Sequence, residues 1–238
     1  MTIQTTTIEY ADGDTTLEGL LAWNDAISGP RPGVLVGHAW GGRSEFEDNK
    51  AKALAELGYT GFSLDLYGKG VNGTNPDENA KLMQPFLDDR EMLQRRMTLT
   101  VEAVRGANVV DASRIVATGY CFGGLAVLDL ARSGADVTGV ISFHGLFNPP
   151  GNTTGTQISA KVMALHGWND PMVPPEAVTA LAQELTDAGA DWQIHGYGNT
   201  YHAFTNPDAN FPDLGAIYHP DADRRSWQSM CNFLQEVF

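Results

Sequence analysis

The hexapeptide Gly-Tyr-Cys-Phe-Gly-Gly at residues 119–124 constrains the fold more than any other part of the sequence. The residues before it, 114–118, form a short β-branched run, and those after it, 125–131, resemble an apolar helix. This arrangement matches the G-x-S-x-G pattern, in which glycines flank a nucleophile on a strained strand-to-helix turn. Here the central residue is Cys121, so the pattern predicts an exposed thiol. The alternative is a small buried cysteine beside ordinary junction glycines.

Strands and helices are predicted to alternate along the rest of the chain. Segments 4–10 and 15–23 flank a turn cluster and indicate an antiparallel hairpin. The later strands are unbroken apolar runs, which favour a mostly parallel, doubly wound α/β sheet covered on both faces. The predicted later strands are 33–37, 60–64, 114–118, 137–143, 161–166 and 191–197, and the predicted helices are 46–57, 90–106, 122–133, 174–188 and 221–238. We expect a single domain spanning residues 1–238.

Composition narrows the classes of function that this fold can serve. Apolar residues make up 42% of the 238 residues and charged residues 18%, which suits a protein with a large core. A net charge of −14 without a basic cluster argues against nucleic acid as a partner. The two cysteines, the N-terminus without a signal pattern, and the absence of a long apolar run favour a cytoplasmic protein with no membrane partner. The oligomeric state is not indicated.

Two irregular stretches, 67–79 and 146–159, are rich in Gly, Asn and Pro. Each begins where a predicted parallel strand ends, which is the edge where open α/β sheets bind ligands. We expect both stretches to form walls of a pocket, with a tolerated surface insertion as the alternative.

Candidates for a base and an acid follow Cys121 in the chain. A thiol attacks a carbonyl group as the thiolate, which a histidine can generate while a carboxylate fixes the tautomer of that histidine. Asp170 comes just after the predicted strand 161–166, and His202 lies in the loop after the predicted strand 191–197. This order of nucleophile, acid and histidine predicts that the three side chains act together. The alternatives are a turn or N-cap aspartate and a surface histidine.

Acyl transfer also requires donors for the developing oxyanion. One donor in this arrangement is the backbone N–H of the residue after the nucleophile, here Phe122. The second donor comes from the loop after the first long parallel strand, residues 37–42, where we expect the N–H of Ala39. The alternative is that the glycines of this loop only form a turn.

Motifs for other chemistries are missing from the sequence. It contains no H-E-x-x-H motif, cysteine pair or close cluster of histidine and carboxylate, and neither a G-x-G-x-x-G nor a P-loop sequence. We therefore expect no metal and no cofactor.

These features together resemble the dienelactone hydrolase family of α/β-hydrolases. The resemblance extends over nearly the whole chain, from the N-terminal hairpin through residues 64–67 and the hexapeptide to Asp170 and residues 202–204. It implies an α/β-hydrolase fold without a large cap domain and a triad of Cys121, Asp170 and His202. It also implies hydrolysis of a small-molecule ester or lactone through an acyl-cysteine intermediate, without a cofactor.

The chain departs from the family pattern at three positions. Family members that cleave dienelactones carry a glutamate at the end of the first long parallel strand, where this sequence reads His38-Ala39. They hold the anionic substrate with two arginines, which correspond here to Lys81 and Asn206. Because lysine lacks the bidentate fork of arginine and asparagine lacks the charge, these changes disfavour an anionic substrate.

A neutral, moderately hydrophobic ester or lactone is therefore the expected substrate. Aromatic residues near the predicted strand ends can supply an apolar wall, although any one of them can belong to the core instead. The expected substrate-binding residues are His38, Trp40, Lys81, Tyr120, Phe147, Trp168, Tyr201, Phe204 and Asn206. The alternative function is a catalytically idle α/β-hydrolase fold that binds a ligand, and a hydrolase acting on C–C or peptide bonds also stays open.

Overall fold

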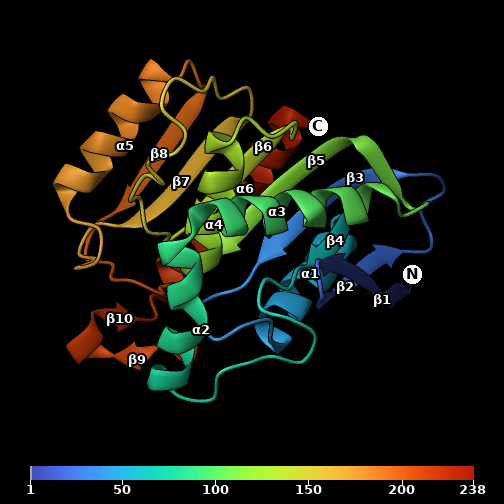
Figure 1. Ribbon diagram of the computed structural model, residues 1–238, viewed down its shortest axis with the longest axis horizontal. Coiled ribbons are helices and arrows are strands. Elements are labelled where there is room, and N and C mark those ends of the chain that lie inside the picture. Colours follow the sequence, from blue (N-terminus) through green and yellow to red (C-terminus); the bar gives the residue numbers. More distant parts are fainter. Residues whose placement is uncertain (1) are drawn as a thin grey trace.

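A computed structural model describes residues 2–238 and shows an eight-stranded sheet with the order β1-β2-β4-β3-β5-β6-β7-β8 (Figure 1). The strands are β1 (Ile3–Asp12), β2 (Thr15–Asn24), β3 (Arg31–Gly37), β4 (Thr60–Ser63), β5 (Val110–Tyr120), β6 (Gly139–Phe143), β7 (Lys161–Gly167) and β8 (Trp192–Tyr197). Strands β1 and β2 form the expected antiparallel hairpin, and β2 pairs antiparallel with β4. All pairs from β4 to β8 are parallel.

Helices cover both faces of the sheet (Figure 1). They are α1 (Glu45–Glu56), α2 (Pro76–Asp88), α3 (Arg90–Arg105), α4 (Phe122–Arg132), α5 (Pro175–Asp187) and α6 (Pro220–Val237). Alternate residues of a strand point to opposite faces, so Leu35 of β3 packs in the cluster with α3, α4 and α5, while Val34 and Val36 pack with α1 and α6. The unbroken apolar runs of the sequence are explained by this burial on both sides.

The chain changes direction across the sheet between β3 and β5. The connection through α1 leads from β3 outward to β4, and the connection through α2 and α3 leads back to β5 on the other side of β3. The loops after β3 and β5 therefore diverge at the carboxyl edge, which is where ligands bind in open α/β sheets. The predicted α/β fold with a mostly parallel sheet is confirmed.

Two elements have no counterpart among the predicted ones. Helix α2 begins inside the stretch that is expected to be irregular, and Phe86 is its one fully buried residue. The second element is a small hairpin of β9 (Asn210–Phe211) and β10 (Ala216–Ile217), joined by a 3-10 turn (Pro212–Leu214). Strands of two residues are too short to produce an alternating pattern.

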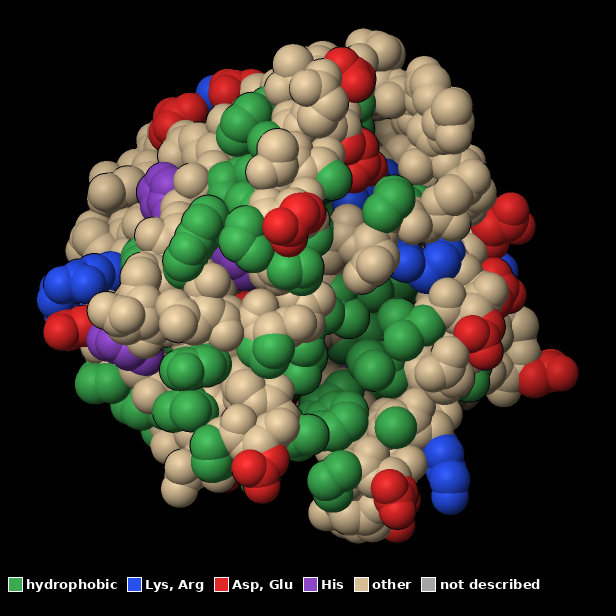
Figure 2. Space-filling model, turned by 90° about the vertical axis from the view of Figure 1, so that its left-hand side faces the viewer, with side chains coloured by type: hydrophobic (Ala, Val, Ile, Leu, Met, Phe, Trp, Pro, Cys, Tyr) green, Lys and Arg blue, Asp and Glu red, His purple; other side chains and the backbone are tan. Residues whose placement is uncertain are grey.

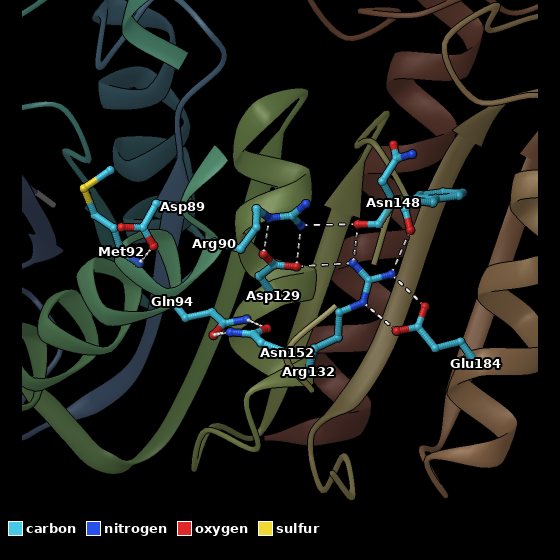
Figure 3. A network of polar contacts seen from close by, with 10 residues as sticks. Asp89, Arg90, Met92, Gln94, Asp129, Arg132, Asn148, Asn152 and Glu184 are labelled. Atoms are coloured by element: carbon cyan, nitrogen blue, oxygen red, sulfur yellow. Dashed lines mark hydrogen bonds and ion pairs between the residues drawn. The ribbon is translucent and has the colours of Figure 1, made fainter. Parts of the chain in front are cut away.

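A buried ion network ties the helices of one face together (Figure 3). The carboxylate of Asp129 on α4 accepts two hydrogen bonds from Arg90 of α3, at 2.6 and 2.7 Å. It also pairs with Arg132, whose guanidinium donates two bonds of 2.8 Å to Glu184 of α5. Because Asp129 is fully buried, the network fixes α3, α4 and α5 relative to one another.

None of the helices within residues 2–238 combines the length and the apolar character needed to cross a membrane.

Candidate active site

Cys121 lies between the end of β5 and the start of α4, in a strained backbone conformation. Its φ is 56° and its ψ is −111°, a region that residues with a Cβ rarely adopt. A Cβ at Gly119 would lie 2.2 Å from the carbonyl oxygen of Gly123, and a Cβ at Gly123 would lie 2.4 Å from that of Gly37. The glycines of the hexapeptide are therefore required by close backbone contact on both sides of the turn.

His202 and Asp170 form a hydrogen-bonded pair at the same edge of the sheet. Nδ1 of His202 lies 2.7 Å from Oδ2 of Asp170, and both side chains are almost completely buried. The other oxygen of Asp170, Oδ1, accepts the N–H of Met172 at 2.8 Å. Because both oxygens are held, the carboxylate orients the imidazole ring.

The β9–β10 hairpin holds the backbone of His202. The N–H of His202 donates to the C=O of Gly215, and its C=O accepts from the N–H of Ile217, both at 2.9 Å. A Cβ on Gly215 would lie 2.3 Å from the ring of Pro171, which follows Asp170. The hairpin therefore packs against the turn that carries the acid and bonds to the loop that carries the histidine.

The electrostatics of His202 favour its protonated form. Within residues 2–238 its buried Nε2 has no hydrogen-bond partner. Burial works to lower the pKa of His202, but the negative charge of Cys121 and the bond to Asp170 outweigh burial and raise that pKa to about 10. An imidazolium with a free Nε2–H can donate a proton within this buried site.

The two expected oxyanion donors lie on either side of the strained turn. Phe122 is the first residue of α4, so its N–H is not used within that helix. The N–H of Ala39 lies 3.4 Å from Oε1 of Glu47, whose Oε2 accepts bonds of 2.9 and 2.7 Å from the N–H and hydroxyl of Ser44, the N-cap of α1. Burial raises the pKa of Glu47, although the bonds from Ser44 oppose this effect. A buried carboxyl group thus holds the loop that carries Ala39.

Cys121 and His202 open into a cavity of about 540 Å³. The apolar part of its wall comes from Trp40, Phe46, Met83, Tyr120, Leu146, Met172, Ala203, Ala209, Phe211, Leu214 and Ala216. On the face of the molecule nearest α5, β9 and β10, hydrophobic side chains gather in patches between polar surface (Figure 2). Within the described chain, Arg43 is the one Lys or Arg in the cavity wall, and it pairs with Asp48 at 3.0 Å.

The structure brings some of the expected substrate-binding residues to this cavity. They are Trp40, Tyr120 and Asn206. His38 instead lies fully buried behind the loop: its Nδ1 donates to the C=O of Ala39 at 2.7 Å, and its Nε2 accepts the N–H of Leu66 at 3.2 Å. With both nitrogens bonded to the backbone, the ring of His38 supports the loop and is closed to a substrate.

The other expected substrate-binding residues lie outside the cavity wall. Lys81 on α2 and Trp168 and Tyr201 on loops are exposed, whereas Phe147 and Phe204 are buried in the core. Residues 72–73 and Leu146 are the parts of the two irregular stretches that reach the cavity, while much of 147–158 lines a separate cavity of about 480 Å³. Further parts of the apolar wall come from α2 and the β9–β10 hairpin, the two elements without a sequence prediction, and from Phe46 of α1, Met172, Ala203 and Ala209.

Six polar residues of the cavity wall are not among the predicted site residues: Arg43, Ser44, Glu47, Asn72, His144 and Thr205. For Glu47 the sequence contains a signal, because Ser44 and Glu47 have the spacing of a capping box. That spacing predicts where the helix starts, but it does not predict that Glu47 reaches the cavity wall. Among residues 2–238, no group of three or more His, Cys, Asp or Glu side chains is arranged to hold a metal ion.

The sheet order, the strained cysteine after β5 and the buried acid–histidine pair define the protein class as an α/β-hydrolase. Residues 17–238 match the Dienelactone hydrolase family. The chain belongs to this family, and the predicted identity as an ester or lactone hydrolase of the α/β-hydrolase class is confirmed.

Individual relatives extend along most of the chain. A proposed carboxymethylenebutenolidase of Aquifex aeolicus is 28% identical over 86% of this chain and 87% of its own length. The crystal structure of a dienelactone hydrolase-like promiscuous phosphotriesterase from metagenomic libraries is 34% identical, with a TM-score of 0.93 over 99% of both chains. A proposed dienelactone hydrolase of Klebsiella pneumoniae is 20% identical with a TM-score of 0.82 over 99% of both chains, and this likeness concerns the fold alone.

Proposed function

We propose that this protein hydrolyses a neutral, hydrophobic carboxylic ester or lactone through an acyl-cysteine intermediate, with Cys121 as nucleophile, His202 as acid and base, and Asp170 orienting His202. The observation that carries the proposal is the strained Cys121 in the same cavity as His202, whose Nε2 is free while its Nδ1 is bonded to buried Asp170.

Each step has a residue that supplies or accepts the proton. The Cys121 thiolate attacks the carbonyl carbon, and the N–H of Phe122 stabilises the resulting oxyanion, joined by the N–H of Ala39 once this group leaves its 3.4 Å contact with Oε1 of Glu47. As the tetrahedral intermediate collapses, the C–O bond breaks and the alkoxide takes the proton from Nε2 of the His202 imidazolium. Water then attacks the thioester as neutral His202 removes its proton, and the thiolate leaves.

The charge of the cavity wall supports a neutral substrate. Arg43 is already paired with Asp48, and Lys81 lies away from the wall. Asn206, which is in the wall, cannot form an ion pair. A substrate carboxylate would therefore be desolvated without an opposite charge, at a considerable free-energy cost.

The test compares the two cysteines of the chain. We expect iodoacetamide to label Cys121 and abolish turnover of short p-nitrophenyl esters, and C121A to lower kcat/KM by about 10³-fold or more. Cys231, a free thiol on α6, provides the matched control, since C231A should retain activity. An acyl adduct on Cys121 in rapid-quench mass spectrometry supports the intermediate, whereas full turnover by C121A would contradict the proposal.

The substrate panel should also contain neutral lactones and anionic dienelactones. We expect weak binding of the anionic compounds, and tight turnover of them would contradict the proposed neutral specificity. If Cys121 reacts with iodoacetamide while no ester or lactone is turned over, the protein is a ligand-binding member of the fold.

A neutral aryl phosphotriester is the second candidate substrate. The favouring observation is the 34% identical neighbour described as a promiscuous phosphotriesterase. Such a substrate is also uncharged and apolar, as the cavity wall requires. Comparison of kcat/KM for p-nitrophenyl esters and a p-nitrophenyl phosphotriester ranks the two candidates.

The two cysteines are both free, and a catalytic thiol is preserved in a reducing compartment. We therefore also propose a cytoplasmic location, which cell fractionation can test.

A further inference from the structure

His144 is a second histidine next to Cys121. It follows β6, is 2% exposed, and lines the same cavity as Cys121 and His202. Its φ of 38° is positive, which is unfavourable for a residue with a side chain as large as histidine. A strained residue persists only where the surrounding structure holds it, and such strain concentrates at functional sites.

Both ring nitrogens of His144 are engaged. The backbone N–H of Cys121 is shared between the C=O of Phe143 at 3.0 Å and Nδ1 of His144 at 3.2 Å, and Nε2 of His144 lies 2.8 Å from the hydroxyl oxygen of Thr205. Since a backbone N–H can only donate, Nδ1 has no proton, and Nε2–H donates to Thr205. This tautomer makes the ring neutral and leaves it without a free lone pair with which to deprotonate the thiol.

The hydrogen bonds of His144 connect the two segments that must meet for the reaction. Cys121 directly follows β5, whereas Thr205 belongs to the loop that carries His202. The ring of His144 also packs edge-to-face against the ring of His202, with centroids 5.2 Å apart, and against Phe204, with centroids 5.1 Å apart. The His144 ring therefore contacts both the segment that carries the thiol and the segment that carries its proposed base.

The distribution of backbone strain agrees with this location. Among residues 2–238, the non-glycine residues with positive φ are Cys121, His144, Asn199 and Ala203. Three of them line the cavity, and Asn199 lies in the loop before His202. The strained positions are thus concentrated around the two reacting groups.

We propose that His144 and Thr205 form a positioning pair that sets the separation and orientation of Cys121 and His202. This inference rests on the proposed function, and it adds two residues that act through the nucleophile and the base without forming or breaking a bond.

The charges around His144 favour the neutral ring that this role requires. Burial, the positive charge of His202 and that of Lys50 on α1 lower the pKa of His144 well below its usual range. Tyr120, whose ring centroid lies 6.0 Å away, and Cys121 are the other titratable groups beside it. Protonation of His144 would place a cation beside the His202 imidazolium and turn one of the two acceptors of the Cys121 N–H into a donor.

Variants of Thr205 distinguish a role of its hydroxyl in positioning His144 from a role of its side chain in packing. T205V keeps the shape and removes the hydroxyl, and we expect kcat to fall about tenfold with KM within about twofold. T205S restores the hydroxyl and should recover most of the lost kcat. The matched control is S229A, which removes the hydroxyl bonded to Nδ1 of His195 at 3.2 Å, outside the cavity, and should leave kcat unchanged.

Variants of His144 test the other half of the pair. We expect H144A to lower kcat by about 100-fold, and H144N, whose amide oxygen can replace Nδ1 as acceptor, to recover about tenfold of that loss. If H144A does not fold, the comparison of T205V with T205S decides. The proposal would be overturned if T205V and H144A both fold and keep the wild-type kcat. It would also be overturned if T205V lowers the free energy of unfolding and leaves kcat unchanged.

Two readouts do not depend on ester turnover. Nitrogen-15 NMR should show His144 with an unprotonated Nδ1 and a protonated Nε2, and T205V should slow the alkylation of Cys121 by iodoacetamide while T205S does not. If the wild-type protein turns over no ester, the proposed function fails, and these two readouts still test whether His144 and Thr205 form a positioning pair. A protonated Nδ1, or equal alkylation rates in T205V and wild type, would overturn it.

Discussion

The protonation of His202 depends on two residues that come from different strand ends. Burial alone would keep the imidazole neutral, and the charge of Cys121 and the bond to Asp170 reverse that effect and raise the pKa to about 10. A raised pKa means that the proton remains on His202 across the neutral range and is lost only as the pH approaches about 10. The proposed donation of a proton from His202 to the leaving group is therefore available at physiological pH.

Replacement of Cys121 should move the titration of His202 downward. The charge of Cys121 is the largest of the effects that raise the pKa of His202, so in C121A the proton should leave at a clearly lower pH. NMR titration of the imidazole measures this shift, and C231A serves as the control with an unchanged midpoint. A midpoint that stays near pH 10 in C121A would show that Asp170 alone sets the ionisation.

At the scale of elements, the β9–β10 hairpin supports the site from outside the main sheet. It bonds to both sides of the His202 backbone and packs on Pro171. Such short strands have little stability by themselves, and they persist here because His202 and Pro171 provide their contacts.

G215A tests that support. Gly215 has a φ of 63°, and an added Cβ would lie 2.3 Å from Pro171, so we expect the hairpin to shift and kcat to fall about tenfold or more. Gly155 is the matched control because it also has a positive φ, 81°, and no atom within 4 Å of an added Cβ. G155A should lower the free energy of unfolding by a similar amount and keep kcat. Equal losses of kcat in both variants would contradict the role of the hairpin.

The ion network of α3, α4 and α5 makes a separate prediction about stability. D129A leaves the buried guanidinium of Arg132 and that of Arg90 without their shared carboxylate, and we expect the free energy of unfolding to fall by about 3–5 kcal/mol. Denaturant unfolding measures the change. Asp136 provides the control, since its carboxylate is almost fully exposed in its pair with Arg105 and D136A should have no measurable effect.

The helices and strands of the main sheet could be predicted because their burial leaves a local pattern. The hexapeptide predicts the turn at Cys121 because its glycines are visible in the sequence, although one of them, Gly123, is required by contact with the distant Gly37. The wall of the cavity could not be predicted in the same way. His38 and His144 both follow strands, yet the first bonds to its own loop and the second to Cys121 and Thr205, and this difference arises only when distant segments pack.

At the scale of the whole molecule, the net charge of −14 acts on every charged ligand that approaches. The screening length falls from about 30 Å at 0.01 M salt to about 8 Å at 0.15 M. Repulsion of an anionic substrate should therefore weaken with added salt, whereas a neutral substrate should be unaffected.

A pair of p-nitrophenyl esters, one with a neutral and one with a carboxylate-bearing acyl chain, tests this expectation. We expect KM for the anionic ester to decrease as salt increases over that range and KM for the neutral ester to stay constant. A KM for the anionic ester that rises with salt would indicate an attractive cation in the cavity.

The change of direction between β3 and β5 places the proposed nucleophile and most of the cavity wall on different parts of the chain. Cys121 is held by the sheet and by α4, whereas most of the cavity wall comes from segments 40–46, 203–216 and α2. Mutations in those segments, apart from Thr205 and Gly215, can alter which acyl and alcohol groups fit while the strand ends keep their arrangement. A library of variants restricted to the wall should therefore yield new substrate preferences with little loss in the free energy of unfolding. The fold is for this reason a suitable starting point for directed evolution.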